Sequence, residues 1–404
     1  MFHGSTLNGQ QWSLHASTTM PRASSLFKRL RRARTPSNND VVATSDVVAN
    51  SGVVVNSDAV FNNGTITPRV EVDGDEGAAL MEVYRGKNPE VDIIAVHGIN
   101  GDPLNTFSTK DNNRFWLGDR DMLPQNVENS RILTYRYPAS VVAVFGSTSS
   151  DRILQHAHTM IAELVANREL ANATTRPIIF ICHSLGGIIV KRALVYSASR
   201  TARHIIHLHS IYVSTYGVLF FGTPHQGSGT ANLGIFAQRI VDVLLPSRVV
   251  DTQSQLLDAL KENSEVLQEI TDNFVPLMKD LRVYFFWEQE KTDLGYKLDY
   301  VVTENSAAPI LDNTERAGLR ADHRNMCKFA SRNAPGYRLV ASSLVRYSRD
   351  APQAISRRWR NENEMRRSLR QQELKNLRED DETYSQAETA NTQTPSKQLA
   401  SLKS

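Results

Sequence analysis

The sequence predicts an α/β fold in which helices cover both faces of a mostly parallel central sheet. Two observations lead to this prediction. Short apolar, β-branched runs alternate with longer segments of helical spacing between residues 80 and 302. Most of the apolar runs are continuous rather than alternating with polar residues, and this is typical of parallel strands buried on both faces.

The expected elements follow one another along the middle of the chain. Strands are expected at residues 80–84, 92–97, 131–137, 177–182, 217–222 and 283–287, and a shorter run at residues 300–302 is expected to close the sheet. Helices are expected at residues 151–170, 186–198, 232–245 and 253–281. In the first helix the apolar residues recur every three or four positions, which is the period of one helix face.

The two ends of the chain differ from the middle, so we expect one folded domain at residues 76–347. Residues 1–75 are predicted to be a disordered tail, basic at first and then of low complexity. Residues 348–404 are predicted to be a charged tail, with a solvated helix at residues 357–381 and disorder beyond it.

Two features of the first tail leave several interpretations open. Arginines cluster between Ser25 and Arg34, and no acidic residue precedes Asp40. This cluster fits a solvated tail, a mitochondrial transit segment, or a nuclear or membrane-surface patch. Four copies of a six-residue unit follow from Asp40. They are interpreted as a low-complexity linker, although their valine pairs carry cross-β potential.

The composition excludes several classes of function. A net charge of +3 over 404 residues argues against a chain that binds nucleic acid as a whole. The two cysteines, Cys182 and Cys327, cannot form a disulfide framework or a cysteine zinc site, and they favour a reducing, intracellular compartment. No transmembrane helix, secretory signal or nucleotide-binding phosphate loop is recognised, and we expect neither a metal nor a cofactor.

The strongest motif is the run Cys182-His183-Ser184-Leu185-Gly186-Gly187, which lies between a predicted buried strand and a predicted helix. This strand–turn–helix context is that of a nucleophile elbow, in which a strained turn pushes a serine hydroxyl out at the carboxyl edge of the sheet. His183, Gly186 and Gly187 belong to the elbow, and Ser184 is the predicted nucleophile. The fold class is therefore refined to an α/β-hydrolase fold.

One position departs from the usual Gly-x-Ser-x-Gly pattern. Cys182 stands where the first glycine is expected. Cysteine is small, so the turn is expected to form, but its geometry is less certain than with glycine at that position.

The loop after the first core strand, His97-Gly98-Ile99-Asn100-Gly101, is predicted to help stabilise an oxyanion. In this fold such a loop supplies one backbone N–H, and the residue after the nucleophile supplies the other. Ile99 and Leu185 are assigned these roles. His97 is interpreted as a structural histidine.

A triad also needs an acid and a base, in the chain order serine, acid, histidine. His323 is predicted as the base because the other ten histidines all precede the strand expected to carry the acid. Glu288, at the end of that strand, is the first choice for the acid. Glu290 and Asp293 remain alternatives.

These motifs, together with Phe221-Gly-Thr-Pro-His225 and Ala321-Asp-His-Arg-Asn325, resemble the SERAC-type (serine active site containing) lipase-like hydrolases over roughly residues 80–347. That group is similar to the inositol deacylases and to the first domain of fungal NACHT-type receptors. The resemblance implies a Ser–acid–His triad, with the run after residue 217 lining the site and no firm role for His225.

The resemblance also implies a lipid or small ester substrate, peripheral membrane contact, and a location at mitochondrial and/or endoplasmic reticulum membranes, with the cytosol as the alternative. The expected function is hydrolysis or transfer of an acyl ester. The competing hypothesis is a signalling module that keeps the hydrolase scaffold with little or no catalysis, since a fold alone does not fix function. The chain would then be a stand-alone form or a fragment of a longer receptor.

Overall fold

The computed structural model of the protein describes residues 79–99, 101–109, 113–139, 149–225, 238–239 and 264–392. The chain divides into two units, Met1–Glu71 and Val72–Ser404, and all of these residues belong to the second. The predicted basic tail, the six-residue repeat and the helix expected at residues 232–245 lie outside the described residues, apart from two helical residues at 238–239.

A seven-stranded sheet forms the centre of the second unit, with the strand order β1-β5-β2-β6-β7-β8-β11. Its strands are β1 (Leu80–Arg85), β2 (Val91–Val96), β5 (Ser130–Tyr135), β6 (Ile178–His183), β7 (Thr215–Phe221), β8 (Arg282–Glu288) and β11 (Thr314–Leu319). Only β1 pairs antiparallel within this sheet, and the other neighbours are parallel. The predicted α/β-hydrolase fold, with its mostly parallel sheet, is confirmed.

Helices cover both faces of the sheet. They are α1 (Pro103–Phe107), α2 (Leu123–Asn126), α4 (Ser149–Leu170), α5 (Leu185–Ala198), α6 (Ser210–Ser214), α9 (Ser264–Phe274), α10 (Glu304–Ala307) and α11 (Tyr337–Thr392). The connections also contain two 3₁₀ helices, η1 (Arg203–His209) and η2 (Val275–Asp280). They contain two small antiparallel strand pairs as well, β3 (Ser108–Thr109) with β4 (Arg114–Phe115) and β9 (Thr292–Asp293) with β10 (Leu298–Asp299).

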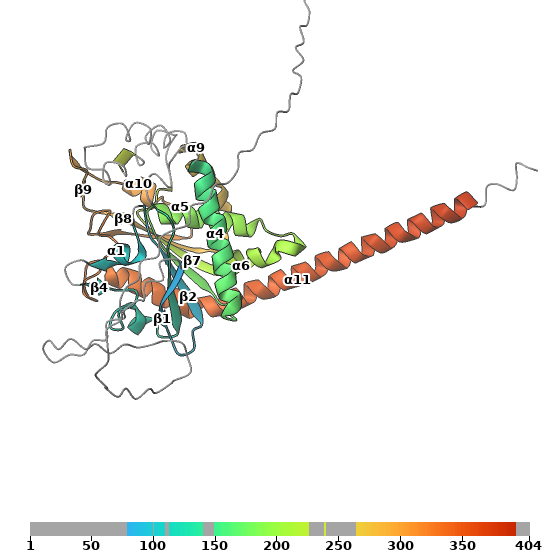
Figure 1. Cartoon of the computed structure of the whole chain (residues 1–404), viewed down its shortest axis with the longest axis horizontal. Helices are drawn as coiled ribbons and strands as arrows, with labels where there is room; N and C mark the ends of the chain where they lie inside the picture. Colours follow the sequence, from blue (N-terminus) through green and yellow to red (C-terminus); the bar gives the residue numbers. More distant parts are fainter. Residues whose placement is uncertain are drawn as a thin grey trace, which may run out of the picture. The chain divides into compact units, whose positions relative to one another are not determined.

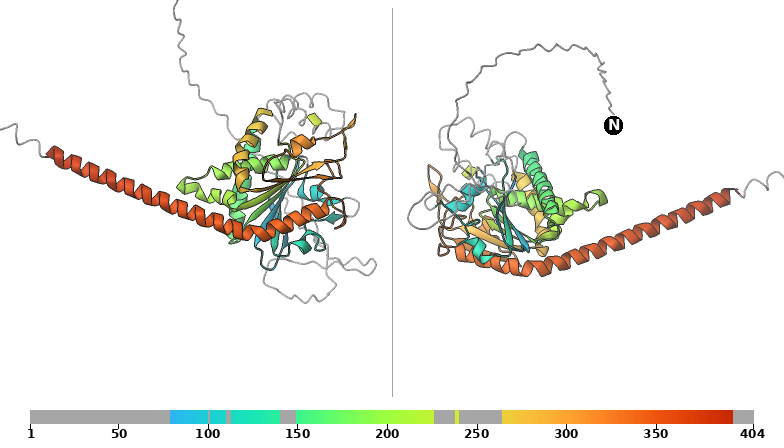
Figure 2. Two further views of the ribbon diagram at one scale, coloured as in Figure 1. Left: turned by 180° about the vertical axis from the view of Figure 1, so that it is seen from behind. Right: turned by 60° about the horizontal axis from the view of Figure 1, so that its bottom comes forward.

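Successive residues of the central strands supply two different cores. Ile94 on β2 packs with α4, α5 and α9, whereas its neighbour Ile93 packs with α2 and α11 on the opposite face. This alternation is the two-residue period of a strand. Figure 1 shows α4 in front of the sheet, and Figure 2 shows α11 in front when the molecule is seen from behind. Because helices cover both faces of the sheet, residues that point to either face are buried, and this explains why the central strands are apolar at successive positions.

The last part of the sheet differs from the prediction. The run expected to close the sheet at residues 300–302 is a bend, and β11 is the closing strand instead. The sequence of β11, Thr-Glu-Arg-Ala-Gly-Leu, carries two charges and only one large apolar residue, so it lacks the signal of a buried strand. An edge strand can be this polar because one of its sides is not covered by another strand.

The helix α11 runs without a break across residue 347, where we placed the end of the folded domain. Beyond that point Arg358 donates to the carbonyl of Thr215 at 2.6 Å, and Trp359 Nε1 donates to Ser214 Oγ at 3.2 Å. Part of the predicted charged tail therefore packs on the folded body, at the start of β7. Among the described residues, no helix is long and apolar enough to cross a membrane.

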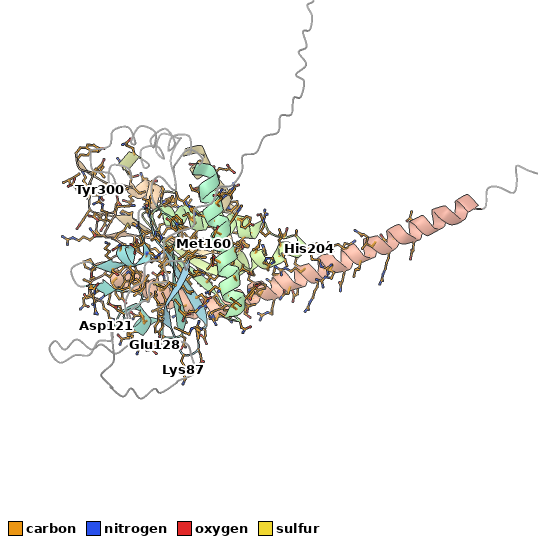
Figure 3. The ribbon with its side chains drawn as sticks, viewed as in Figure 1. Lys87, Asp121, Glu128, Met160, His204 and Tyr300 are labelled. Carbon is orange, nitrogen blue, oxygen red and sulfur yellow. The ribbon has the colours of Figure 1, made fainter. Side chains whose placement is uncertain are left out.

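The two ends of the sheet have different neighbours. Figure 3 places Tyr300 beside β9 and α10 at one end, and Lys87 and Glu128 at the other. The carboxyl ends of the parallel strands point to the first of these ends, where β6 and β8 finish at His183 and Glu288. In open α/β sheets this is the edge at which ligands bind.

Candidate active site

Ser184 occupies a strained turn between β6 and α5. Its backbone angles are φ +50° and ψ −121°, a conformation that residues other than glycine rarely adopt. The turn is held in place because Ser184 N–H donates to the carbonyl of Phe221 at 2.8 Å, and Gly187 N–H donates to the carbonyl of Ser184 at 3.1 Å. The serine hydroxyl is thereby directed away from the helix that follows it.

Small residues around Ser184 allow close packing of the turn. A β-carbon at Gly186 would lie 2.4 Å from the carbonyl oxygen of His97, and one at Gly187 would lie 2.2 Å from Thr223 Oγ1. Cys182 faces the core cluster with α5, and burial raises the pKa of its thiol well above the ordinary value. The departure from glycine at this position is accommodated because the side chain enters the core.

Ser184, His323 and Glu288 form one hydrogen-bonded chain. Ser184 Oγ lies 3.0 Å from His323 Nε2, and His323 Nδ1 lies 2.6 Å from Glu288 Oε2. A carboxylate only accepts hydrogen bonds, so Nδ1 carries the ring proton and Nε2 is free to accept from the serine hydroxyl. The three residues are 1%, 3% and 2% exposed, respectively. In such a buried setting water screens these contacts little.

Glu288 is held by two further donors. The backbone N–H groups of Val301 and Val302 both donate to its second oxygen, Oε1. Both oxygens of the Glu288 carboxylate therefore have hydrogen-bond donors, Oε2 from His323 and Oε1 from the two backbone groups. The run at residues 300–302, which we had expected to be a strand, instead anchors this side chain.

The pairing of two strands places Glu288 beside the loop that carries His323. Leu319, the last residue of β11, is in register with Glu288, the last residue of β8. The chain then turns, and His323 N–H donates to Thr292 Oγ1 at 3.2 Å. The other two candidate acids lie apart from this arrangement: Glu290 is exposed and faces Arg320 at 3.7 Å, and Asp293 Oδ1 accepts from Gly295 N–H. Of the three predicted carboxylates, only Glu288 contacts His323.

The loop after β2 runs directly beside the serine. A β-carbon at Gly98 would lie 3.1 Å from Ser184 Cβ. His97 Nε2 accepts from Tyr137 N–H at 3.3 Å, so its proton is on Nδ1, which donates to the carbonyl of Gly98 at 2.9 Å. Burial lowers the pKa of His97 to about 4, which keeps the ring neutral. His97 therefore holds the plane of the peptide bond between Gly98 and Ile99.

The backbone N–H groups of Ile99 and Leu185 are the two predicted oxyanion donors. The carbonyl and N–H of a trans peptide point in opposite directions. Because the carbonyl of Gly98 points to His97, the N–H of Ile99 points away from that ring. Leu185 begins α5, and the first N–H groups of a helix have no partner within the helix. The assignment of Ile99 and Leu185 as oxyanion donors stays a prediction, and the start of α5 suits it because negative charge is favoured at the N-terminal end of a helix.

Two other histidines near the site are neutral. His183 Nε2 lies 2.9 Å from the carbonyl of His323, and burial lowers the pKa of His183 to about 3. His225 packs against Phe220 and Phe285, and burial lowers its pKa well below the ordinary value. Neither ring takes the place of His323 beside Ser184.

Two residues of the run after β7, Gly222 and Thr223, contact the site, and the sequence analysis had assigned neither of them a role. Thr223 Oγ1 donates to the carbonyl of Ser184 at 3.0 Å. Gly222 has φ +56°, and a β-carbon there would lie 2.9 Å from the ring of His323. The run therefore lines the site, as the resemblance implied, and glycine is required where it meets the histidine.

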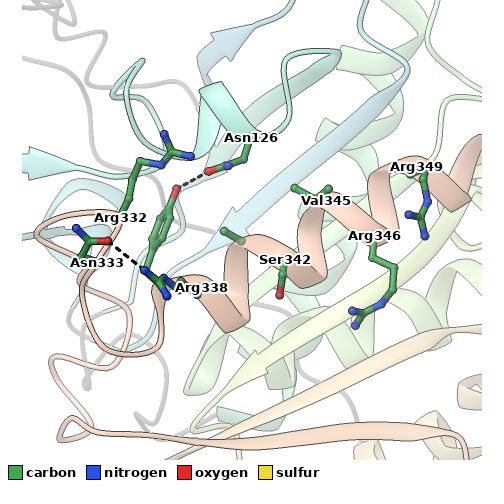
Figure 4. A pocket seen from close by; sticks show the side chains of 10 residues that line it. Asn126, Arg332, Asn333, Arg338, Ser342, Val345, Arg346 and Arg349 are labelled. Atoms are coloured by element: carbon green, nitrogen blue, oxygen red, sulfur yellow. Dashed lines mark hydrogen bonds between the residues drawn. The ribbon is translucent and has the colours of Figure 1, made fainter.

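A cavity of about 830 Å³ lies elsewhere, along α11. Figure 4 shows Arg332, Arg338, Arg346 and Arg349 at its rim, and two hydrogen bonds, from Tyr337 to Asn126 and from Arg338 to Asn333. None of its lining residues belongs to the chain of contacts at Ser184. Within the described part of the chain, no cluster of histidine, cysteine or acidic residues could hold a metal ion.

Comparison with known proteins gives one consistent group of relatives. No protein-family model matches the chain. It is 25% identical over 292 residues to the SERAC1 protein of Bos taurus, covering 67% of this chain and 41% of that protein. It is 26% identical to SERAC1 of Danio rerio over 254 residues, which is 59% of this chain and 36% of that protein. It is 24% identical to human SERAC1 over 273 residues, which is 63% of this chain and 39% of that protein.

Two solved structures that align with the chain at low similarity are reported for comparison. A mature lipase of Bacillus licheniformis aligns with a TM-score of 0.42 at 19% identity, covering 66% of this chain and 97% of the lipase. A carboxylesterase structure from Nitrososphaera gargenis aligns with a TM-score of 0.38 at 14% identity, covering 67% of this chain and 95% of that one.

The curated relatives are larger than this chain, which spans about two fifths of their length, 41% in the bovine protein. The similarity to fungal NACHT-type receptors is not tested by these comparisons and stays a prediction. The motifs around Ser184 and His323 had already indicated the same relationship. In its sequence the chain is similar to the SERAC1 proteins, and its own core has the α/β-hydrolase fold.

Proposed function

We propose that the protein is a serine hydrolase that cleaves or transfers the acyl group of an ester. The observation that carries this proposal is the chain of contacts from Ser184 Oγ through His323 to Glu288, at 3.0 Å and 2.6 Å. A serine hydroxyl is a weak nucleophile at its free pKa, and an adjacent base activates it. The tautomer that Glu288 imposes on His323 is the one that can act as this base.

The first half of the proposed reaction forms an acyl-enzyme. His323 Nε2 takes the proton of Ser184 as the serine oxygen attacks the ester carbonyl. The N–H groups of Ile99 and Leu185 stabilise the negative charge that develops on the carbonyl oxygen. When the tetrahedral intermediate collapses, His323 gives its proton to the departing alcohol. Glu288 offsets the charge of the imidazolium in between.

The second half releases the acyl group. His323 removes a proton from water, or from an acceptor alcohol, which attacks the acyl-enzyme carbonyl. The same oxyanion donors act again, and the proton returns to Ser184 Oγ. Hydrolysis yields a carboxylic acid, and transfer yields a new ester.

We propose a lipid ester as the substrate. Ile99 and Trp287 both pack against a buried apolar cluster that contains Leu294, Val301 and Val302, so the surroundings of the loop after β2 are apolar on this side. An acyl chain fits such surroundings better than a charged group does. The resemblance to SERAC-type proteins implied the same substrate class and a peripheral contact with mitochondrial or endoplasmic reticulum membranes, and we propose both.

A fluorophosphonate probe tests the reaction type. The full chain is expected to label at Ser184, and Ser184→Ala and His323→Ala are expected not to label. Ester turnover is expected to fall by roughly 10⁴–10⁶ in the serine variant. Folded wild-type protein that neither labels nor hydrolyses a panel of acyl esters of increasing chain length would overturn the proposal in favour of a scaffold without catalysis.

A separate measurement tests the location. A fluorescent fusion of residues 1–39 is expected to reach mitochondria or the endoplasmic reticulum. A fusion that stays diffuse in the cytosol rules out targeting by this segment.

A further inference from the structure

Lys191 is a fully buried lysine beneath the site that the proposed reaction does not use. It lies on the second turn of α5, the helix that begins after Ser184, and it is 0% exposed. Its Nζ donates to the carbonyl of Pro224 at 3.0 Å and to Thr271 Oγ1 on α9 at 3.1 Å, and it lies 5.8 Å from the centre of the Phe220 ring. These contacts join α5, α9 and the run after β7.

The partners of Lys191 are neutral. In the part of the chain that the structure describes, no carboxylate lies within ion-pair distance of its Nζ. The titratable groups that face it are the thiol of Cys182 and the ring of His225. Burying an ammonium group without an anion costs several kcal/mol. An apolar side chain of similar length would fill the space without that cost, so packing alone does not explain a lysine here.

Residues 222–225, the segment that Lys191 contacts, touch two members of the chain of contacts at Ser184. Thr223 Oγ1 donates to the carbonyl of Ser184 at 3.0 Å, and Gly222 lies against the ring of His323. The segment is fastened at its ends by two backbone bonds, from Gly222 N–H to Phe286 O at 2.9 Å and from His225 N–H to Ser306 O at 2.7 Å.

Between these two ends, beside the bond that Thr223 makes to Ser184, Lys191 donates to the backbone of the segment. Proline has no N–H, so Pro224 cannot add a backbone donor of its own. Its carbonyl accepts from Lys191, and a buried carbonyl needs such a donor. Burial lowers the pKa of Lys191 to about 7. Both the ammonium and the neutral amine can donate an N–H, so the contact persists in either state.

We propose that Lys191 is a positioning residue for the reaction at Ser184. It fixes the segment Gly222–His225 against α5, and that segment sets the carbonyl of Ser184 and the ring plane of His323. This inference rests on the proposed serine hydrolase function. To the proposed mechanism it adds the contact between Lys191 on α5 and the carbonyl of Pro224, which helps to set the 3.0 Å separation of Ser184 Oγ and His323 Nε2.

The test compares Lys191→Met with Arg192→Met in the full chain. Methionine keeps the unbranched shape of lysine and removes both hydrogen bonds, whereas Arg192 is the next residue of α5 and is partly exposed. Lys191→Met is expected to lower kcat and the rate of fluorophosphonate labelling by about 10- to 100-fold, the effect of a small misplacement of reacting groups, with KM little changed. Arg192→Met is expected to match wild type.

A double-mutant cycle separates positioning from a loss of fold stability. Thr223→Val removes the bond to the Ser184 carbonyl, and Thr271→Val removes the contact with α9. If Lys191 acts through the segment, its effect on kcat is non-additive with that of Thr223→Val. Thr271→Val loses only the contact with α9 and keeps the bond from Lys191 to Pro224, so by itself it is expected to leave kcat close to the wild-type value. Unchanged kcat in folded Lys191→Met, or additivity with Thr223→Val, overturns the inference.

Two further measurements keep the outcome clear. If Lys191→Met does not fold, Lys191→Gln takes its place. Its side chain keeps an N–H donor but is too short to keep the bond to Pro224 at its present length, so kcat is expected to fall below the wild-type value. Wild-type kcat in this variant counts against the inference. The downfield N–H resonance of His323, which reports its bond to Glu288, is expected to shift in Lys191→Met and to stay in place in Arg192→Met. This resonance can be recorded without turnover. Wild-type protein without activity would therefore refute the proposed function, while the effect of Lys191 on the bond between His323 and Glu288 could still be measured.

Discussion

Gly186 lies directly against the backbone of His97, since a β-carbon at position 186 would be 2.4 Å from the His97 carbonyl oxygen and 2.8 Å from that of Val96. The helix that carries Ser184 and the strand that leads to Ile99 therefore meet without a side chain between them. This contact brings the proposed nucleophile next to the loop that supplies one of the oxyanion donors.

We expect Gly186→Ala to separate these two elements and lower kcat. Backbone oxygen atoms cannot yield as a flexible side chain can, so the added methyl group must push the oxyanion loop away from Ser184. A loss of about 100-fold or more in kcat is expected, with a lower melting temperature, because overpacking typically costs 1–3 kcal/mol. Gly295→Ala is the control: it is strained by its φ of +85°, yet it meets no atom within 4 Å. Equal activity of the two variants would contradict the interpretation.

His97→Phe is expected to act on the oxyanion without touching the serine or its base. Phenylalanine keeps the stacking on Tyr137, where the ring centres are 4.4 Å apart, but it loses the bond from Nδ1 to the Gly98 carbonyl. The Gly98 carbonyl then keeps only the bond from Gly101 N–H at 3.2 Å, so the peptide of Ile99 is held less firmly. Removing one oxyanion donor typically costs about 10²–10³ in kcat. Steady-state kinetics measure this loss, and labelling at Ser184 should slow in parallel. His158→Phe, at a ring that packs on Tyr196, is the matched control.

Glu288→Gln is expected to lower turnover by roughly 10⁴, as in triads generally. A glutamine amide has one oxygen, so it cannot accept both from His323 Nδ1–H and from the N–H groups of Val301 and Val302. Either the histidine takes the wrong tautomer or the loop at residue 301 loses its anchor. Glu290→Gln is the control and should keep wild-type turnover, because Glu290 is exposed and faces Arg320. The opposite ranking in an ester assay would move the acid to Glu290.

The buried Lys191 makes stability depend on pH. Its pKa falls from 10.5 to about 7 on folding, so between these values the unfolded chain binds more protons than the folded one. The free energy of unfolding therefore rises with pH across this window, by on the order of 5 kcal/mol in total, and the penalty is fully present below about pH 7. Urea unfolding should show this rise in wild type and in Arg192→Met. In Lys191→Met the rise should be largely absent, and an unchanged slope would mean that the lysine is not the titrating group.

The central strands could be predicted because they are buried on both faces. In β2, β6 and β7 nearly every residue is apolar, and the sequence shows this directly. The edge strand β11 escaped prediction because its pairing with β8 stabilises it in spite of its polar residues. The bend at residues 300–302 was mistaken for a strand because two buried valines have the same apolar signal, whatever the direction of the backbone.

For the site, the sequence could indicate residues that belong to a motif. Ser184 stands in a strand–turn–helix context, and His323 follows the acid in chain order, so each could be named. The choice among Glu288, Glu290 and Asp293 needed strand register, which side-chain patterns do not encode. The contacts of Lys191 and Thr223 join segments far apart in the chain. Such contacts leave no local signal in the sequence.

The position of β11 at the edge of the sheet has a consequence for how the protein would lose function. His323 is carried by the loop that leaves this strand, and five of the six residues of β11 are only partly buried. Proteins open locally first where few buried contacts hold them. His323 therefore follows an edge strand of the sheet. Local unfolding of β11 alone would separate His323 from Ser184 while the other six strands remained paired. We therefore expect the contact between Ser184 and His323 to be lost under milder conditions than those that unfold the central sheet.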